Sequence, residues 1–473
     1  MKISEVMPQR CLLYGGALLI GINFVIPGFE WTVIIGLLPF YYYIDNISSV
    51  RMRYAYLDIY LSGLLIFCFA NIFFLQIEPA NWDFILPGWF SNIAGVSAWL
   101  LASLISALSF LLIPKISLII ENKTYRLAML PFIWFVVELV GALFFSFISY
   151  GRGGSIGFEN NFGSLASIAS SLPVVFASRI VGFYGMSILV NFLALAIYLG
   201  LVKRQLKYSV VCLILPLGFI IGSYYLMNPK ASRSRNLHVV VMHLNESDSL
   251  DKQINFSELR FNIDLFVLPE YSKVQKNPNF DELLKRLSPT GLLVTTKLEG
   301  QSPNATNDLI FINKQGAEIS VQPKHRLIPG GEYMPYSLAG VFKLIGKQDF
   351  NELFKYSYQL SKGSNEISTV SYGGINLGAL PCSGAISTSS YMNMVSHGAE
   401  VLINSASLSL LNEDSSYHVL AKRMALFQAV RNNRPFIQAS RSGNSLIINP
   451  NGQIQGINSG SATQLIDSDI LVD

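Results

Sequence analysis

Seven apolar stretches in the first half of the sequence constrain the fold more than any other feature. Each has roughly the 20 residues that a helix needs to cross the hydrocarbon layer of a bilayer. They are centred on residues 11–28, 30–46, 56–77, 89–113, 129–149, 180–201 and 208–227. The 473-residue chain is 51% hydrophobic and only 14% charged, unlike an ordinary soluble protein of this length. The sequence therefore predicts a transmembrane bundle of about seven helices over residues 1–230.

The basic residues predict the orientation of this bundle, because short cytoplasmic connections are enriched in Lys and Arg. Ten of them lie at the N-terminus and in alternate connections: Lys2, Arg10, Arg51, Arg53, Lys115, Lys123, Arg126, Lys203, Arg204 and Lys207. The intervening connections hold only Arg152 and Arg179. We expect the N-terminus in the cytoplasm, and seven crossings then place the chain after Met227 on the extracytoplasmic side.

After about residue 230 the composition becomes more polar, and short β-branched runs typical of strands alternate with other stretches. The runs are LHVVVM, LFVLPE, GLLVTT, DLIFIN, VLINS, PFIQAS and SLIINPNGQI. A helical stretch, SYHVLAKRMALFQAVRNN, separates VLINS from PFIQAS. The sequence predicts an α/β domain over residues 231–473, with its sheet covered on at least one face.

Three reactive side chains follow strand-like runs in this domain, where active residues of α/β folds tend to lie. Glu270 ends DLFVLPE, Lys324 follows AEISVQP, and Cys382 follows GGINLGALP. Taken singly, they are better explained as a solvated turn glutamate, a surface lysine and an inert buried cysteine. Together they supply a base, a cation and a nucleophile, which suits acyl transfer through a thioester.

Other site chemistries find little support in the sequence. Cys382 is the only cysteine of the polar half, and the five histidines lack ligand spacing, so we expect no disulfide there and no structural metal. The net charge of +4 is spread over the ends of apolar segments. Nucleic acid is therefore an unexpected partner, and a membrane surface a better one.

The stretch that begins at Lys324 resembles the bacterial apolipoprotein N-acyltransferase family, a membrane-embedded branch of the nitrilase, or carbon-nitrogen hydrolase, superfamily. That family carries a lysine, two further residues and then L-V-P-F-G-E-Y-V-P. Here Lys324 is followed, after two residues, by LIPGGEYMP over residues 327–335. LFVLPEYS is similar to the family's strand ending in W-P-E, and the helix and strands over AKRMALFQAVRNNRPFIQASRSGNSLIINPNGQI also resemble the family. WFVVELVGALFF and RIVGFYGMSILV resemble its membrane segments, so the similarity covers most of the chain.

The resemblance implies a multispanning helical bundle followed by a nitrilase-like α-β-β-α sandwich. It also implies a reaction without a cofactor. Glu270 would take the thiol proton, Cys382 would attack the ester of a phospholipid, and Lys324 would stabilise the oxyanion. Glu332 would support the site through the lysine. The acyl acceptor would be the N-terminal amine of a lipoprotein, and the protein would lie in the bacterial inner membrane with its catalytic domain on the periplasmic side.

The sequence departs from the family near the nucleophile. Ser383 and Gly384 stand where the family has Tyr and Glu. Only Ser405 of SASLS matches the family's Ser-Asn-Asp-x-Trp signature, and the chain ends at LIDSDILVD where the family usually has another transmembrane helix. Two alternatives therefore stay open: a paralogue acting on another exported peptide amine or amide, for example in a conjugation or secretion system, and a non-catalytic lipid-binding relative.

Two further features of the membrane half admit more than one interpretation. Glu138 lies inside an apolar run, where an acid is either functional or hydrogen-bonded within the bundle. The loop YGRGGSIGFENNFG could cradle a headgroup phosphate with its amides and Arg152, or could be a flexible connector.

Overall fold

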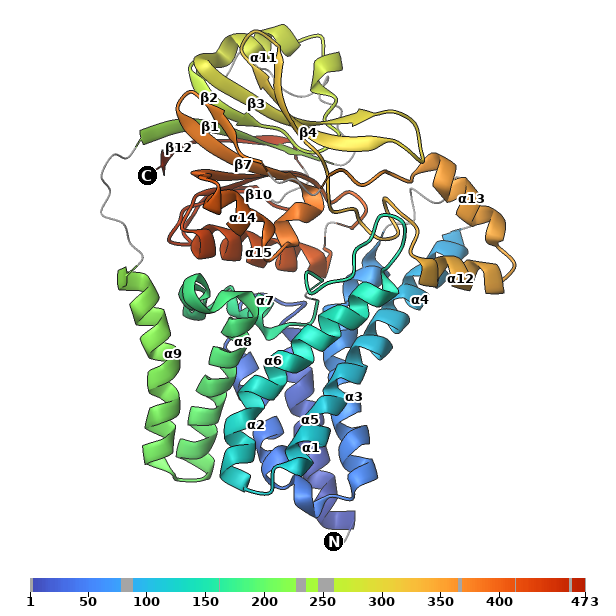
Figure 1. Ribbon diagram of the computed structural model, residues 1–473, viewed down its shortest axis with the longest axis vertical. Coiled ribbons are helices and arrows are strands. Elements are labelled where there is room, and N and C mark those ends of the chain that lie inside the picture. The colour runs from blue at the N-terminus through green and yellow to red at the C-terminus, as the bar shows by residue number, and fades with distance from the viewer. Residues whose placement is uncertain are drawn as a thin grey trace. The chain divides into compact units, whose positions relative to one another are not determined.

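The computed structural model describes residues 3–77, 88–160, 162–226, 235–245, 259–364, 368–412, 414–458 and 462–472. The chain separates into a helical unit and a sheet unit (Figure 1). The helical unit comprises Met1–Ile77, Trp89–Ile148 and Ile156–Asn228. The sheet unit comprises Pro229–Asp473 together with Glu78–Gly88 and Ser149–Ser155. A short piece of the connection after residue 148 thus belongs to the sheet unit.

The helices of the helical unit follow the apolar stretches of the sequence. They are α1 (Ile3–Ile22), α2 (Thr32–Asp45), α3 (Met52–Ala70), α4 (Gly88–Ala107), α5 (Leu112–Ile119), α6 (Lys123–Ile148), α7 (Leu165–Ala169), α8 (Ser178–Ile197) and α9 (Leu206–Leu226). Continuous apolar runs favour helix here, because a helix satisfies its own backbone hydrogen bonds in an apolar surrounding.

Five helical segments among the described residues are long and apolar enough to cross a bilayer, which fits a membrane protein. They are Met52–Gln76, Ile93–Ile119, Lys123–Ile148, Pro173–Val202 and Leu206–Tyr225. The first two of the seven predicted stretches are not among the five, although helix α1 has 20 residues. Helix α1 already ends at Ile22, and the 14 residues of α2 span only about 21 Å against a hydrocarbon layer of about 30 Å.

Glu138 ties three helices of this unit together. From α6, its carboxylate accepts hydrogen bonds from the hydroxyls of Ser164 and Ser187, both at 2.6 Å. It also accepts from the Leu165 amide at 2.8 Å and from the Trp134 indole at 3.1 Å. All four donors are neutral, and the Glu138 residue is 6% exposed. The geometry fits the interpretation of an acid hydrogen-bonded within the bundle.

The described residues of the sheet unit form twelve strands. They are β1 (Arg235–Leu244), β2 (Ile263–Val267), β3 (Leu287–Glu299), β4 (Thr306–Asn313), β5 (Glu318–Gln322), β6 (Val370–Tyr372), β7 (Ile375–Pro381), β8 (Val401–Ser407), β9 (Phe436–Arg441), β10 (Ser445–Ile448), β11 (Ile454–Asn458) and β12 (Gln464–Val472). The main order is β5-β4-β3-β2-β1-β9-β8-β7-β6, and β12 returns antiparallel along β1. Every strand run predicted from the sequence contains a strand here, although the strand in LFVLPE ends at Val267 and SLIINPNGQI covers β10, a turn and the start of β11.

Two halves of this sheet pack face to face, and the side chains that alternate along each strand divide between an inner and an outer core. Val239 and Val241 of β1 belong to an inner core that also includes Ile403 and Ile437 from the other half. The intervening residues of β1, such as Val240, face an outer core shared with α11 (Phe280–Arg286). Because successive side chains point to opposite faces, one strand serves both layers.

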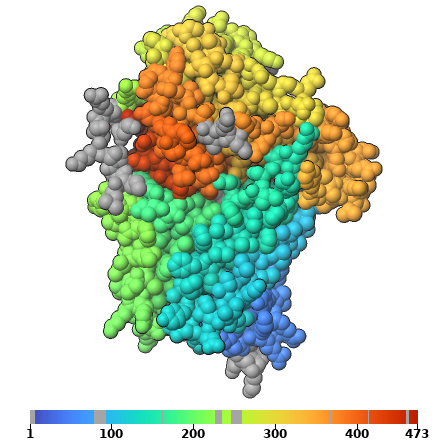
Figure 2. All heavy atoms as spheres, viewed as in Figure 1, coloured from blue at the N-terminus to red at the C-terminus, as the bar shows by residue number. Residues whose placement is uncertain are grey.

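Helices cover the outer faces, so the predicted α-β-β-α sandwich is confirmed (Figure 1). Residues of α14 (Ser390–Ser396) and α15 (Ser416–Asn432) form a third core with β7 to β10. Two helices that the sequence did not predict, α12 (Tyr336–Leu344) and α13 (Gln348–Ser357), protrude from the side of the sheet unit (Figure 2). They directly follow the stretch that contains Lys324 and Glu332.

Candidate functional site

Glu270 lies two residues beyond Leu268, past the carboxyl end of β2, where the sequence placed it. Its residue is only 1% exposed. Its backbone amide donates to the carbonyl of Ala406 at 3.2 Å, so β8 holds the end of β2 in place. The Ser405 hydroxyl adds a bond to the Leu268 carbonyl at 2.7 Å. These contacts fix the direction of the glutamate side chain.

Lys324 is the centre of a buried charge cluster. It follows β5 and Pro323, and its residue is 1% exposed. Its ammonium donates to Oε1 of Glu270 at 2.7 Å and to Oε1 of Glu332 at 2.5 Å. Lys324 is therefore buried and does not lie on a surface loop. The structure brings three of the four predicted site residues into direct contact.

Glu332 holds both the lysine and its own loop. While Oε1 accepts from Lys324, Oε2 accepts from the backbone amide of Ile328 at 2.9 Å. Tyr271 also donates its hydroxyl to Glu332 Oε1, at 3.3 Å. The carboxylate thus joins the loop over residues 328–332 to the segment just after Glu270. Without it, Lys324 would face Glu270 alone.

Cys382 sits at a sharp turn between a strand and a helical turn. Strand β7 ends at Pro381, and a 3₁₀ turn begins at Cys382, whose φ of 38° lies in the left-handed region. Asn404 stabilises the turn by donating its side-chain amide to the carbonyls of Leu380 at 2.8 Å and Cys382 at 3.1 Å. The thiol donates to the Ser407 carbonyl at 3.5 Å. A strained residue at such a turn directs its side chain out of the sheet.

The cluster shifts the pKa of each reactive group. Burial raises the pKa of Glu270, and the charge of Glu332 raises it further, while Lys324 and a hydrogen bond with the Cys382 thiol lower it. Burial also raises the pKa of the thiol, with added repulsion from Glu270. For Lys324, burial opposes the charge but the two carboxylates outweigh it and hold its pKa well above the ordinary value. The thiol is thus neutral at rest, and the ammonium is charged.

This arrangement contains the parts of covalent acyl chemistry. A thiol nucleophile lies beside a carboxyl group of raised pKa, which can take its proton near neutral pH. A buried ammonium can stabilise negative charge on a carbonyl oxygen, because interactions are stronger in a water-poor site. With Glu270, Glu332 and Lys324 ionised, the cluster carries one net negative charge. Proton transfer from Cys382 to Glu270 leaves that charge unchanged.

Ser383 and Gly384, at which the sequence departs from the apolipoprotein N-acyltransferases that it resembles, are closely packed. Gly384, at the position of the family glutamate, has no room for a side chain, because a Cβ there would lie 2.5 Å from Cβ of Leu380. Ser383 donates its hydroxyl to the Arg326 carbonyl at 2.5 Å and so ties the nucleophile turn to the lysine stretch. The local backbone is therefore packed around the smaller residues.

Sequence reasoning missed three residues that contact the site. Asn307 in β4 donates its amide to Glu270 Oε1 at 2.6 Å. Tyr271 directly follows Glu270 and has a φ of 60°, and Asn404 supports the nucleophile turn. Asn404 carried a usable signal, since a polar amide interrupts the apolar run VLIN. Asn307 carried no such signal, because it lies at the start of a strand, where polar residues are common.

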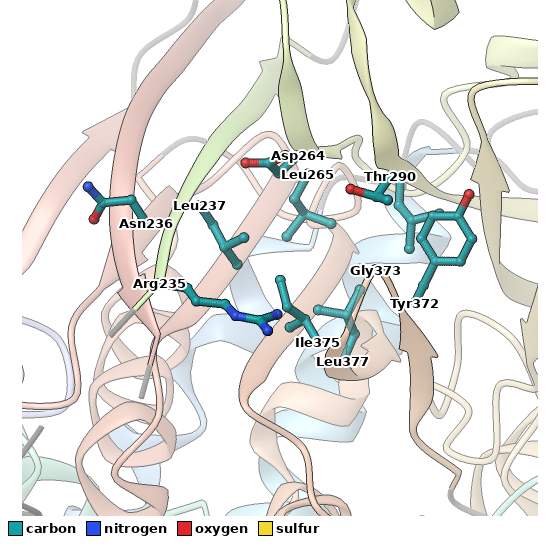
Figure 3. A pocket seen from close by; sticks show the side chains of 11 residues that line it. Arg235, Asn236, Leu237, Asp264, Leu265, Thr290, Tyr372, Gly373, Ile375 and Leu377 are labelled. Atoms are coloured by element: carbon teal, nitrogen blue, oxygen red, sulfur yellow. The ribbon is translucent and has the colours of Figure 1, made fainter. Parts of the chain in front are cut away.

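A cavity of about 310 Å³ lies at the opposite ends of the parallel strands (Figure 3). Its walls come from the first residues of β1 and β2, from β3, and from the turn between β6 and β7. Arg235 lies beside it and donates to the Gly374 carbonyl at 3.0 Å. None of Glu270, Lys324 or Cys382 lines this cavity. It is therefore not the space in which those residues meet.

No group of three His, Cys, Asp or Glu side chains that could hold a metal ion occurs in the part of the chain that the structure describes. The buried acids at the site already have cationic or amide partners. Their geometry suits proton transfer and charge stabilisation.

Comparison with known proteins identifies the sheet unit. A family model described as carbon-nitrogen hydrolase matches residues 227–472. A carbon-nitrogen hydrolase from Helicobacter pylori G27 is 15% identical, with 50% of this chain and 88% of that chain covered and a TM-score of 0.35. An amidase from Nesterenkonia sp. is 16% identical over 50% and 90%, with a TM-score of 0.34. Saccharomyces cerevisiae Nit3, of branch 10 of the nitrilase superfamily, is 19% identical over 50% and 90%, with a TM-score of 0.34. No curated protein matches the chain.

Proposed function

The chain belongs to the carbon-nitrogen hydrolase family, and from that premise we propose that it is a membrane acyltransferase. It moves a fatty acyl chain from a phospholipid, through a thioester on Cys382, to the N-terminal amine of a lipoprotein. The observation that carries the proposal is the buried ammonium of Lys324 between Glu270 and Glu332, with the Cys382 thiol close enough to this cluster to affect the pKa of Glu270. The five long apolar helices of the same chain support a reaction with a membrane lipid.

The first half-reaction forms the thioester. Glu270 takes the thiol proton, and the sulfur of Cys382 attacks the ester carbonyl of the phospholipid. Lys324 stabilises the negative oxygen of the tetrahedral intermediate. When that intermediate collapses, the carbon–oxygen ester bond breaks, and the leaving alkoxide takes the proton from Glu270. The products are an acylated Cys382 and a lysophospholipid, with Glu270 ionised again.

The second half-reaction transfers the chain to an amine. The neutral amine attacks the thioester carbonyl, and the carbon–sulfur bond breaks as the amide bond forms. Glu270 receives a proton from the amine nitrogen and returns it to the thiolate of Cys382, so no net proton is gained by the site. Water in place of the amine would give a free fatty acid. Exclusion of water therefore decides the yield of amide.

A membrane location follows from the nature of the donor. Each methylene of an acyl chain is worth about 0.8 kcal/mol in an apolar surrounding, so a diacyl lipid does not readily leave the bilayer. We propose that the sheet unit works on the extracytoplasmic side of a bacterial inner membrane. In this proposal the five candidate segments cross the bilayer, so the two ends of the bundle lie on opposite sides. The two ends of the bundle remain on opposite sides when α1 and α2 both cross the bilayer, and also when neither of them crosses.

The packing at Gly384 favours a second candidate function. The apolipoprotein N-acyltransferases that the sequence resembles carry a glutamate at the position of Gly384. Here Leu380 leaves no room for that side chain. The part of the site that would hold the acceptor therefore differs from the family, while the thioester-forming groups are kept. The second candidate uses the same thioester but transfers it to another exported peptide amine, or hydrolyses an amide.

Intact mass spectrometry tests the first half-reaction. The purified protein is incubated with vesicles of phosphatidylethanolamine and phosphatidylglycerol, and the mass of the wild type is compared with that of Cys382→Ala. We expect a fatty acyl adduct that hydroxylamine removes in the wild type and no adduct in the variant. Cys212→Ala, which alters a cysteine in the span Leu206–Tyr225, is the matched control and should keep the adduct.

The acceptor is tested next with the acylated protein. A synthetic peptide with an N-terminal diacylglyceryl-cysteine should remove the adduct and gain one acyl chain. An adduct that persists with this peptide but transfers to another peptide amine supports the second candidate. A wild type that acquires no adduct from either phospholipid would refute the phospholipid-dependent reaction.

A further inference from the structure

The glycine-rich segment over residues 149–155, which follows helix α6, packs on the loop that contains Glu332. The two form a short antiparallel contact in which Gly151 bridges Pro335. The amide of Tyr336 donates to the carbonyl of Tyr150 at 2.9 Å. The hydroxyl of Tyr333 donates to the carbonyl of Ser149 at 2.6 Å. Both partners belong to the sheet unit.

Three glycines of this segment make the approach possible. A Cβ on Gly151 would lie 2.6 Å from the carbonyl oxygen of Met334, which is a backbone atom. One on Gly153 would lie 2.7 Å from Cδ1 of Leu327 and 2.9 Å from the ring of Tyr333. One on Gly154 would lie 2.7 Å from the Tyr333 hydroxyl. Real Cβ atoms do not sit this close to other atoms, so a side chain at any of the three would push the loop away.

Tyr333 connects this contact to the charge cluster. It directly follows Glu332, is 3% exposed, and packs with Ala305, Leu327 and Leu360. Its carbonyl accepts from the Gly330 amide at 2.8 Å, and the carbonyl of Glu332 accepts from Leu360 at 2.8 Å. The backbone on both sides of the Glu332 side chain is thus held, and the ring of Tyr333 is held by the glycines.

We propose that the segment 149–155 positions Glu332 against Lys324 by clasping Tyr333, and so sets the geometry of the reactive cysteine. This role rests on the function proposed above. It adds positioning residues, which act on the reactive cysteine through Tyr333 and Glu332. It also explains why YGRGGS is rich in glycine without assuming that the loop binds a headgroup phosphate. The amide of Gly154 already donates to the carbonyl of Gly151 at 3.1 Å.

The test measures the rate at which iodoacetamide alkylates Cys382, a reaction that needs no lipid. The thiolate displaces iodide from the reagent, and peptide mass spectrometry distinguishes Cys382 from the other three cysteines. The variants are Gly153→Ala, which adds one methyl group against Tyr333, and Tyr333→Phe, which removes only the hydroxyl. The matched control is Gly157→Ala, because nothing lies within 4 Å of a Cβ at Gly157.

We expect alkylation of Cys382 to slow by about tenfold or more in Gly153→Ala and by less in Tyr333→Phe, since small displacements at a reactive centre cost up to about 100-fold. Gly157→Ala should match the wild type. The pH profile should also change. Glu270 faces Lys324, Glu332, Tyr271 and Cys382, and displacing Glu332 removes a charge that raises the pKa of Glu270. The acid limb should therefore move to lower pH.

Equal rates and equal pH profiles in the wild type, Gly153→Ala and Tyr333→Phe would overturn the proposal. A uniform loss at every pH, accompanied by a lower unfolding temperature, would also overturn it, because it would indicate a structural role alone. The result separates this inference from the proposed function. If the wild type acquires no acyl adduct but the variants still change cysteine reactivity, the positioning role stands and the acyltransferase assignment fails.

Discussion

Glu138 in the helical unit and Glu270 in the sheet unit are both buried acids, yet their partners differ in kind. Glu138 accepts four hydrogen bonds from neutral donors on its own and neighbouring segments. Glu270 accepts from an ammonium and an amide, and its neighbour is a thiol. In the first pattern, three of the four hydrogen bonds join α6 to neighbouring segments. The second leaves a proton acceptor beside a nucleophile, so burial alone does not mark a catalytic acid.

The largest expected effect separates these two acids directly. Glu270→Gln removes the base and should lower the rate of thioester formation at Cys382 by about 10²–10⁴-fold. Glu138→Gln should leave that rate close to the wild type, because Glu138 has no reactive neighbour. The rates are measured as acyl adduct formed per minute by mass spectrometry. A comparable loss in Glu138→Gln would break the comparison and assign chemistry to the bundle.

Replacing the cation should have the next largest effect. Lys324→Ala removes the group proposed to stabilise the oxyanion, so thioester formation should fall by about 10²–10³-fold. It also leaves Glu270 and Glu332 buried without their cation, and the unfolding temperature should drop. Lipid binding, followed by co-purified phospholipid, should persist. The control is Lys297→Ala, which removes a partly exposed lysine paired with Glu299 and Glu318. An unchanged rate in Lys324→Ala would refute the oxyanion role.

The pH dependence sharpens the assignment of Glu270. A base must be ionised, and burial together with Glu332 raises the pKa of Glu270 above its ordinary value of 4.5. The rate of thioester formation should therefore rise with pH along an acid limb whose midpoint lies above 4.5. Glu332→Gln removes one of the raising charges, so its midpoint should be lower than that of the wild type. An unchanged midpoint would show that Glu332 does not act on Glu270, and an upward shift would contradict the predicted sign.

The smallest effect is expected in the helical unit. Ser187→Ala deletes one of the four donors to Glu138, which should cost about 1–3 kcal/mol of unfolding free energy while thioester formation stays unchanged. Thermal unfolding in detergent measures the cost. Ser223→Ala is the matched control, since that buried hydroxyl has no hydrogen-bond partner among the described residues. Equal unfolding temperatures for the two variants would show that Glu138 does not stabilise the bundle.

Much of the site was predictable because its residues follow strands that are themselves easy to predict. Glu270 and Cys382 come directly after apolar runs, and parallel strands bring their carboxyl ends to one edge of a sheet. The contact between Lys324 and Glu332 could be inferred only through the family resemblance. The amide of Asn307 on Glu270 could not be inferred at all, because it depends on how β2 and β4 both pair with β3.

The helical unit shows the same division. Apolar length alone predicted the five long helices, because hydrophobicity over about 20 residues is a local property. It overestimated α2, whose helix ends at Asp45 after 14 residues. Nor could the sequence distinguish the two roles open to Glu138. That distinction required Ser164 and Ser187, which lie 26 and 49 residues away in the chain.

The sequence by itself determined the apolar helices, the alternating strands and the order of Glu270, Lys324 and Cys382, because each depends on neighbours along the chain. Only the tertiary structure decided that β12 returns along β1, that a glycine-rich segment clasps Tyr333, and that Gly384 has no room for a glutamate. These features depend on close approach between distant segments. Atomic packing sets that approach, and no local pattern in the sequence records it.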